Sequence, residues 1–214
     1  MEAKSSLSPF RCAVVLFEGF TVLDVYGPVQ AFASCRVPQP DGSEQRLFTL
    51  FSMAMAPGIV RSSEGPPSYA EYSFVTAPGP YDILLIPGGL GTRTAVNDAD
   101  FLRHLAAASQ RARLTATVCT GSALLARTGL LDGRPATSNK LAWDWVVQQG
   151  PRVHWQRQAR WIDAGNIVTA SGVSAGIDMA LGLVARLCGR DIARAAARRM
   201  EYRWHEDPAD DPFA

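Results

Sequence analysis

The sequence has few cysteines, few histidines and almost no net charge. Its four cysteines stand at positions 12, 35, 119 and 188, and none of them forms a C-x-x-C pair. Its three histidines stand at positions 104, 154 and 205, and none has zinc-ligand spacing. This pattern argues against a disulfide framework or a zinc motif and favours a reducing compartment. We therefore expect a cytoplasmic protein that uses no metal and no cofactor.

Long apolar runs and basic clusters are also missing. No apolar run reaches the roughly 18 to 20 residues that a membrane span requires, and the segment 1–9 lacks the hydrophobic core of a signal peptide. The formal net charge is +1, with Lys and Arg scattered along the chain. The arginines at 194, 198, 199 and 203 are typical of the exposed face of a late helix. We expect no membrane partner and no nucleic-acid partner.

What the sequence does contain is an alternation of apolar strands and amphipathic helices. We predict strands at 11–17, 47–55, 82–86, 114–118, 153–155, 160–163 and 166–170, with short strands or a hairpin at 58–61 and 68–74. We predict helices at 21–34, 101–111, 120–127, 141–149, 173–188 and 191–203. This order indicates an α/β protein with a flavodoxin-like, doubly wound, mostly parallel sheet and helices on both faces. With 214 residues and no linker-like segment, we expect residues 1–214 to form one domain, with an extended tail from about 204.

Three turns follow strands at the edge where active sites of such sheets lie. They cover residues 18–24, 87–89 and 119–121. Cys119 comes directly between a buried strand and a helix, as the nucleophile of a nucleophile elbow does. A helix N-terminus favours negative charge, so we expect the Cys119 thiolate to be stabilised there. The commoner alternative is a buried structural cysteine, which is our interpretation of the other three.

Backbone groups and one carboxyl group complete the candidate site. Thr120 and Gly121 are expected to present free N–H groups, and Gly88–Gly89 to add more as an oxyanion pocket. Asp24 has apolar neighbours, so burial would keep its carboxyl group protonated unless it is hydrogen-bonded. A helix cap is the alternative role for Asp24, and Glu18 competes with it as the catalytic carboxyl group.

Four segments of the chain resemble the ThiJ/PfpI superfamily, also called class I glutamine-amidotransferase-like. They are 23–28 (LDVYGP), 86–89 (IPGG), 118–137 (VCTGSALLARTGLLDGRPAT) and 170–178 (ASGVSAGID). The resemblance spans about residues 10 to 203, and the segment around the cysteine is its most specific part. Within the superfamily the sequence is most similar to the isonitrile hydratase branch, because an aspartate stands in the first turn where many relatives carry a glutamate.

The resemblance implies a cysteine-dependent hydro-lyase that adds water to a small molecule, an isonitrile, to give an N-substituted formamide. Cys119 matches the nucleophile, and Asp24 matches the proton donor and base. Gly89 and Thr120 are then expected to orient water or an anion, with Gly172 and Val173 bordering the pocket. The resemblance also implies a homodimer.

The sequence departs from the superfamily at Asn139. Relatives commonly carry a histidine after the segment that corresponds to Ala136–Ser138, so a Cys–His dyad is not supported here. Gly88 and Asn139 are expected as possible pocket residues, and Asn139 either supplies a hydrogen-bond donor or acceptor there or caps the helix that begins near 141. Two other functions stay open: a redox or stress role in which Cys119 is oxidised, and a ligand-sensing regulatory domain without a DNA-binding module.

Overall fold

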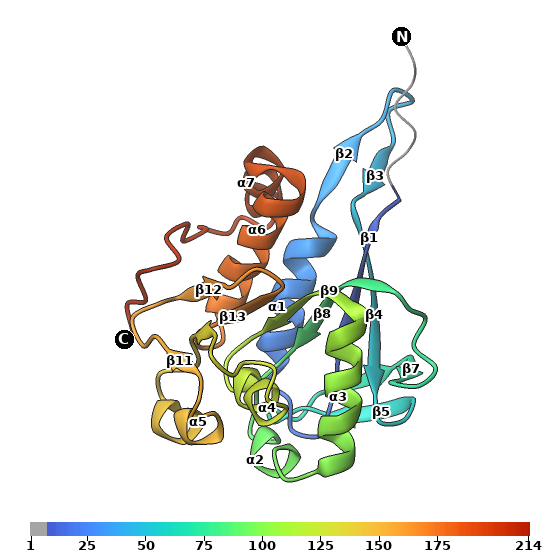
Figure 1. The fold of residues 1–214 in the computed structure, drawn as a ribbon. Helices are drawn as coiled ribbons and strands as arrows, with labels where there is room; N and C mark the ends of the chain where they lie inside the picture. The colour runs from blue at the N-terminus through green and yellow to red at the C-terminus, as the bar shows by residue number, and fades with distance from the viewer. Residues whose placement is uncertain (1–7) are drawn as a thin grey trace.

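A seven-stranded sheet forms the centre of the protein in a computed structural model, which describes residues 8–214 (Figure 1). Across the sheet the strands follow the order β12 (Trp161–Asp163), β13 (Ile167–Ala170), β9 (Ala112–Thr117), β8 (Tyr81–Ile86), β1 (Phe10–Val15), β4 (Phe48–Ala54) and β7 (Tyr72–Ser73). Only β12 runs antiparallel to its neighbour. The predicted flavodoxin-like, mostly parallel sheet is confirmed. The signal-peptide expectation concerns residues 1–9, of which 1–7 lie outside the described residues.

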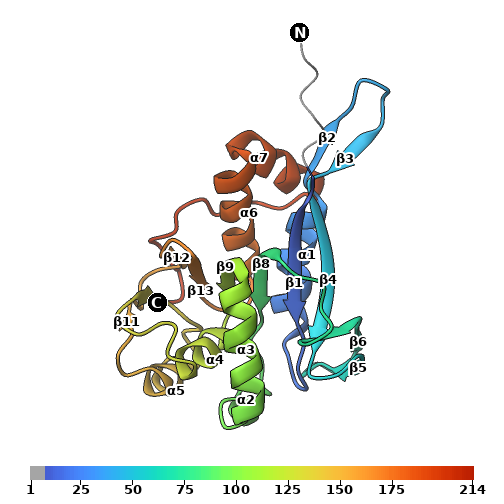
Figure 2. The ribbon, with the colours of Figure 1, turned by 45° about the vertical axis from the view of Figure 1, so that its right-hand side comes forward.

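Helices cover both faces of the sheet, as expected for strands that are apolar on both sides (Figure 2). α1 (Val22–Ala33) and α6 (Ala175–Cys188) pack against each other on one face, and α7 (Arg190–Arg199) packs on α6. α3 (Ala99–Arg111) and α4 (Gly121–Arg127) cover the other face. In β8, residues 83–86 are fully buried between these layers. The two shorter helices are α2 (Thr92–Ala95) and α5 (Trp143–Gln149).

Some short elements were not predicted from the sequence. The hairpin of β2 (Arg36–Pro38) and β3 (Glu44–Arg46) projects from the body of the protein (Figures 1 and 2). Its residues are exposed or half-buried and none is buried, so the two short strands carry no core-facing alternation that would reveal them. β10 (Pro135–Ala136) pairs with β11 (His154–Trp155) and, like α2, is too short for a periodic signal. The hairpin expected after β4 is present as β5 (Gly58–Arg61) and β6 (Pro67–Ala70).

The tail from residue 204 contains no helix or strand, and hydrogen bonds hold it on the protein. Its Pro208 carbonyl oxygen accepts hydrogen bonds from the N–H groups of Arg160 and Trp161, at 2.9 and 3.2 Å. Further along, the Asp211 N–H group donates to the Gln158 carbonyl oxygen at 3.0 Å, and Asp211 is only 2% exposed. The tail therefore lies along the edge of the sheet beside β12.

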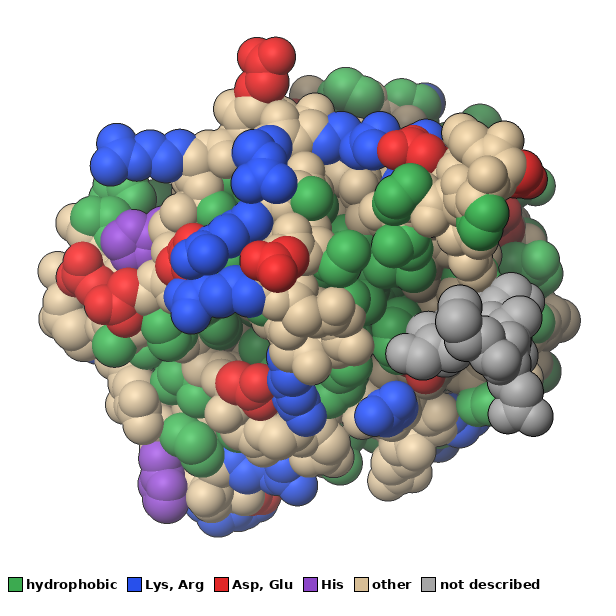
Figure 3. All heavy atoms as spheres, turned by 90° about the horizontal axis from the view of Figure 1, so that it is seen from above, with side chains coloured by type: hydrophobic (Ala, Val, Ile, Leu, Met, Phe, Trp, Pro, Cys, Tyr) green, Lys and Arg blue, Asp and Glu red, His purple; other side chains and the backbone are tan. Residues whose placement is uncertain are grey.

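Charges on the described surface are mixed in sign. Figure 3 shows the face seen from above, where Lys and Arg side chains stand next to Asp and Glu side chains. On α7, Arg190 and Arg194 both pair with Glu206, and Arg199 pairs with Glu44. No helix within residues 8–214 is long and apolar enough to cross a membrane. The same residues contain no group of three or more His, Cys, Asp and Glu able to hold a metal ion.

Candidate functional site

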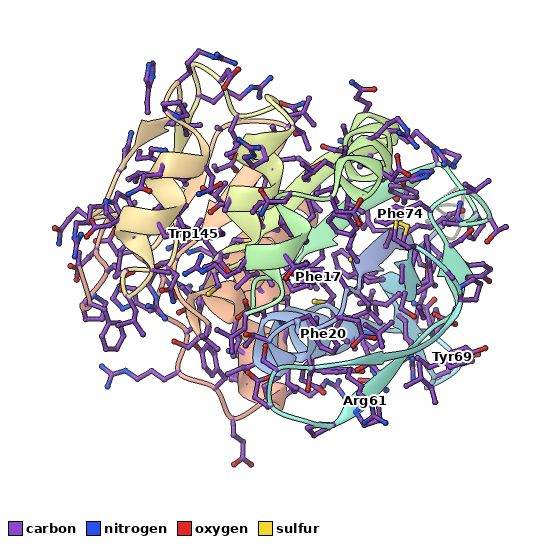
Figure 4. The ribbon with its side chains drawn as sticks, turned by 90° about the horizontal axis from the view of Figure 1, so that it is seen from below. Phe17, Phe20, Arg61, Tyr69, Phe74 and Trp145 are labelled. Atoms are coloured by element: carbon purple, nitrogen blue, oxygen red, sulfur yellow. The ribbon has the colours of Figure 1, made fainter. Side chains whose placement is uncertain are left out.

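Four adjacent strands, β1, β8, β9 and β13, bring the candidate residues together at their carboxyl ends. Asp24 lies in the first turn of the helix after β1, and Gly88 follows β8. Cys119 follows β9, and Gly172 follows β13. After β1 the chain adds β4 and β7 toward one edge of the sheet, and from β8 onward it adds strands toward the other edge. Such sheets bind ligands at the point where this direction changes, which here lies between β1 and β8. Figure 4 looks onto this end, with Trp145 of α5 on one side and Phe20 from the turn after β1 on the other.

Cys119 is held in a backbone conformation that L-residues rarely adopt. Its φ is 56°, as expected for the predicted sharp turn between strand and helix. The Cys119 N–H group donates to the Ser171 carbonyl oxygen at 2.9 Å. The Cys119 carbonyl oxygen accepts from the hydroxyls of Ser138, at 2.8 Å, and Ser122, at 3.2 Å. These contacts fix the strained turn, a feature that clusters at functional sites.

The sulfur of Cys119 lies in a buried position that backbone N–H groups face. Burial raises the pKa of the Cys119 thiol to about 12, and the negative charge of Asp24 acts in the same direction. The N–H groups of Thr120 and Val173 and the Thr120 side chain lower the pKa, but by less. Burial therefore opposes the thiolate that the helix N-terminus was expected to stabilise, because desolvation outweighs the N–H groups.

Asp24 is a fully buried carboxyl group beside that thiol. Its Oδ2 accepts a hydrogen bond from the Gly88 N–H group at 2.9 Å, and its Oδ1 has no hydrogen-bond partner among the described residues. Burial raises the pKa of Asp24 to about 7, against the lowering effect of Gly88 and the Cys119 side chain, and the charge of Glu64 raises it further. Asp24 can therefore exchange a proton near neutral pH.

Glu18, the competing carboxyl group, lies elsewhere. It is exposed and accepts weak hydrogen bonds from the Arg61 N–H group, at 3.3 and 3.4 Å. It lines a separate cavity of about 480 Å³ together with Phe17, Ile59 and Phe101. The geometry thus favours Asp24 over Glu18 as the partner of Cys119.

The glycines after β8 build the site differently from the sequence-based expectation. The Gly88 N–H group is used by Asp24, and the Gly89 N–H group donates to the Thr120 hydroxyl at 3.0 Å. The Gly121 N–H group donates to the Val118 carbonyl oxygen at 2.9 Å. The expected oxyanion pocket at Gly88, Gly89 and Gly121 is therefore wrong for this resting state, because internal hydrogen bonds already satisfy these donors. Thr120 and Val173 supply the N–H groups instead.

Gly88 must be a glycine for steric reasons. A Cβ atom there would lie 2.5 Å from the Thr120 nitrogen, 2.6 Å from the Thr120 hydroxyl oxygen and 2.9 Å from Asp24 Oδ2. Those separations are too short for any real side chain. The absence of a side chain lets the strand ends that carry Asp24 and Cys119 approach each other.

Gly172, Val173 and Asn139 line a second pocket, of about 320 Å³, and Val173 connects this pocket to the thiol through its N–H group. Val173 has a φ of 22°, and its N–H group faces the Cys119 sulfur. Asn139 Oδ1 accepts from the Ala142 N–H group at 2.7 Å, so Asn139 caps the turn that leads into α5. The Asn139 side chain also lines the pocket and lies against Gly172, and a hydrogen bond from Asn139 to a substrate stays a prediction.

Several residues of the site were not singled out from the sequence. Ser122 follows Cys119 by three residues, so local spacing could have revealed its hydrogen bond to the turn. Ser138 and Glu64 reach the site only through tertiary contacts: Ser138 bonds the Cys119 carbonyl oxygen, and Glu64 accepts from the Val22 N–H group at the start of α1. Phe213 lines the second pocket from the far end of the chain.

The chain is similar to several known proteins. The model of the DJ-1/PfpI family matches residues 10–186. The chain is 31% identical over 188 residues to isonitrile hydratase from Pseudomonas putida, covering 88% of this chain and 76% of that protein. It is 28% identical over 195 residues to the HTH-type transcriptional regulator GbdR from Pseudomonas aeruginosa, and those residues cover 91% of this chain but only 51% of the regulator.

Solved structures of the same family have a similar fold. A ThiJ/PfpI family protein from Pseudomonas syringae superposes with a TM-score of 0.79 at 31% identity, covering 96% of this chain and 78% of that chain. DJ-1beta from Drosophila melanogaster superposes with a TM-score of 0.76 at 17% identity, covering 92% and 100%, which supports the fold alone. The predicted family is confirmed. From its sequence, its fold and the strained cysteine turn at the end of β9, the chain belongs to the DJ-1/PfpI family.

Proposed function

We propose that the protein is a cysteine-dependent hydro-lyase of the isonitrile hydratase type, which converts R–N≡C and water to R–NH–CHO. One observation carries the proposal: the buried thiol of Cys119 lies beside the buried carboxyl group of Asp24, whose pKa is raised to about 7. The similarity to isonitrile hydratase supports the substrate class. The site needs only these two groups and small N–H donors, so the proposed reaction uses no cofactor.

In the first step Asp24 acts as an acid. Protonated Asp24 donates a proton to the terminal carbon of the isonitrile, which makes that carbon electrophilic. The Cys119 sulfur bonds to the same carbon, and the thiol proton passes to the Asp24 carboxylate. One S–H bond is broken, one S–C and one C–H bond are formed, and the product is a thioimidate, R–N=CH–S–Cys119. Asp24 is again protonated.

In the second step water replaces the sulfur. Asp24 hands its proton to the imine nitrogen, and its carboxylate takes a proton from the water that bonds to the carbon. The resulting C–O–H group collapses to C=O as the C–S bond breaks, and the sulfur recovers a proton through Asp24. The N–H groups of Thr120 and Val173 face the sulfur and stabilise the negative charge that forms on it. Gly172 lines the pocket without supplying a charge, and Gly89 holds the Thr120 hydroxyl through its N–H group.

Purified protein assayed with a simple alkyl isonitrile tests the proposal. We expect formamide formation by the wild type and none by Cys119→Ala. The matched control is Cys188→Ala, because Cys188 is a half-buried thiol at the end of α6, away from the site. Formamide formation by Cys119→Ala, or none by the wild type, would contradict the proposal.

A second candidate is a ligand-sensing domain that binds a small molecule at the same site without turning it over. The match to a transcriptional regulator, about half of whose length this chain spans, favours it. Saturable binding of an isonitrile or formamide to the wild type, with no turnover and no thioimidate adduct in the intact mass, would select this candidate.

We further propose that the chain forms one domain and works as a cytoplasmic homodimer. The tail from 204 packs on the same sheet as the family-matched region, which supports one domain. All four thiols are free, which suits a reducing compartment. Leu23 and Tyr26 expose apolar surface on α1 beside Tyr69 of β6, which suits a dimer contact. Light scattering is expected to give the mass of two chains, and the mass of one chain would exclude the dimer.

A further inference from the structure

The tail from residue 204 packs on the protein through buried polar contacts. Asp178 of α6, fully buried, accepts through Oδ1 from the Tyr202 hydroxyl and the His205 N–H group, both at 3.0 Å. The Trp204 indole N–H group donates to the Asp178 carbonyl oxygen at 3.1 Å. Arg160 binds the other oxygen of the same carboxylate through Nη2 at 2.5 Å. The start of the tail is therefore anchored on the buried face of α6.

A second anchor lies near the end of the tail, at Asp211. Its carboxylate is 3.5 Å from the Lys140 ammonium and 3.6 Å from the Arg160 guanidinium, and all three side chains are at most 7% exposed. Removing one partner of a buried ion pair leaves the other charge buried without compensation, which strongly destabilises the protein. The pair therefore holds the tail in one position. Lys140 also donates to the Thr137 hydroxyl at 2.8 Å and to the Ala159 carbonyl oxygen at 2.9 Å. Its ammonium group is thus fully engaged inside the protein.

This second anchor fixes Phe213 at the mouth of the 320 Å³ pocket. The Phe213 N–H group donates to Asp211 Oδ1 at 3.2 Å, and the ring lines the pocket with Leu23, Leu141 and Val173. Val173 is the residue whose N–H group faces the Cys119 sulfur. Phe213 and Leu141 are 73% and 98% exposed, which leaves apolar surface open around the pocket.

We propose that Phe213, positioned by Asp211, forms the outer wall of the substrate pocket and selects isonitriles with a neutral, apolar and bulky substituent. The inference rests on the proposed function. The isonitrile carbon must reach Cys119, so the substituent extends past Val173 into the space that Phe213 and Leu141 border. Leu23, Leu141, Val173 and Phe213 give the pocket four apolar side chains, and the one cation that lines it, Lys140, is already paired with Asp211. A charged substituent would find no free partner among the described residues that line this pocket.

The test compares kcat/KM for benzyl isonitrile and methyl isonitrile. We expect wild type to prefer the benzyl compound and Phe213→Ala to lower the benzyl-to-methyl ratio about tenfold, through the benzyl substrate. Asp211→Asn is expected to lower the ratio in the same direction. The double variant should fall no further than Phe213→Ala, because Asp211 acts through Phe213. Val75→Ala, which removes an equally exposed apolar side chain outside the pocket, is the control and should keep the wild-type ratio.

A ratio in Phe213→Ala equal to that of wild type would overturn the inference. Additive losses in the double variant would overturn the positioning role of Asp211. Phe213→Ala is safe for folding because its ring is 73% exposed, and deletion of residues 212–214 is a second variant with the same expected ratio. Binding of N-benzylformamide and N-methylformamide to Cys119→Ala, followed by NMR, separates the two proposals. Benzyl-selective binding that is lost with Phe213 supports the pocket even if wild type turns over no isonitrile, while absence of that selectivity counts against it.

Discussion

The carboxyl group of Asp24 accepts a hydrogen bond from the Gly88 backbone through one oxygen and leaves its other oxygen without a hydrogen-bond partner among the described residues. The two residues follow neighbouring strands, β1 and β8, and are brought together because Gly88 has no side chain. One oxygen is thereby oriented and the other stays available for proton transfer. Four predictions follow from this arrangement and its neighbours.

The rate of isonitrile hydration should fall as pH rises above about 7. The first step requires protonated Asp24, and burial raises the pKa of this carboxyl group to about 7. Above that pH the acid form of the free enzyme falls tenfold per pH unit, so kcat/KM at pH 9 should be about a hundredfold below its value at pH 6. A pH profile of initial rates measures this. A profile that rises between pH 6 and pH 9 would instead indicate a thiolate as the limiting form.

Replacement of Asp24 by asparagine should stabilise the protein at high pH while it abolishes most of the activity. Because the pKa of Asp24 is raised on folding, the native state binds more protons than the unfolded state between about pH 4 and pH 7. Wild type therefore loses stability as pH rises through this window, by on the order of 4 kcal/mol. Asp24→Asn lacks this loss.

Urea unfolding of wild type and Asp24→Asn at pH 4 and pH 8 measures the effect. The free energy of unfolding of the variant should exceed that of wild type at pH 8, with a smaller difference at pH 4. Asp100→Asn is the control, because Asp100 is an exposed aspartate on α3. Equal pH dependence in Asp24→Asn and wild type would show that this carboxyl group is not buried in the way described.

Mild peroxide should leave Cys119 largely unmodified in the resting protein. The thiolate is the form that oxidises, and burial raises the pKa of the Cys119 thiol to about 12. Peptide mapping after brief peroxide treatment, with Cys119→Ser alongside, measures this. Selective conversion of Cys119 to the sulfinic acid at low peroxide would favour the redox role over hydration.

Asn139→Ala should cost stability more than activity. The Asn139 side chain accepts from the Ala142 N–H group at the turn into α5, and loss of such a cap costs about 1 kcal/mol. We expect thermal unfolding to shift downward while kcat for a small isonitrile changes less than tenfold. Asn97→Ala is the matched control, since the Asn97 amide makes only a long, exposed hydrogen bond to the Arg93 carbonyl oxygen. A loss of kcat larger than a hundredfold would make Asn139 part of the chemistry.

The sequence alone determined the sheet, the layers and the position of Cys119. Apolar strands that alternate with amphipathic helices leave few arrangements open, and a cysteine between β9 and α4 can only sit on the turn at the end of the strand. Asp24 was also identifiable, because a carboxyl group among apolar neighbours is costly to bury unless it is hydrogen-bonded or protonated. These are local signals, carried by residues near one another in the chain.

Only the tertiary structure decided which donors face the sulfur, in which direction the pKa of the thiol shifts, and which residues border the pocket. The N–H groups of Gly88 and Gly89 are used by Asp24 and Thr120, so the free donors come from Thr120 and Val173. The pKa of Cys119 depends on burial, which sums contacts from all layers of the fold. Phe213 reaches the pocket through a buried ion pair at Asp211, more than 70 residues along the chain from Lys140. Pairings between residues so far apart in the chain produce no periodic or local pattern in the sequence, because they depend on how the helices and strands pack in three dimensions.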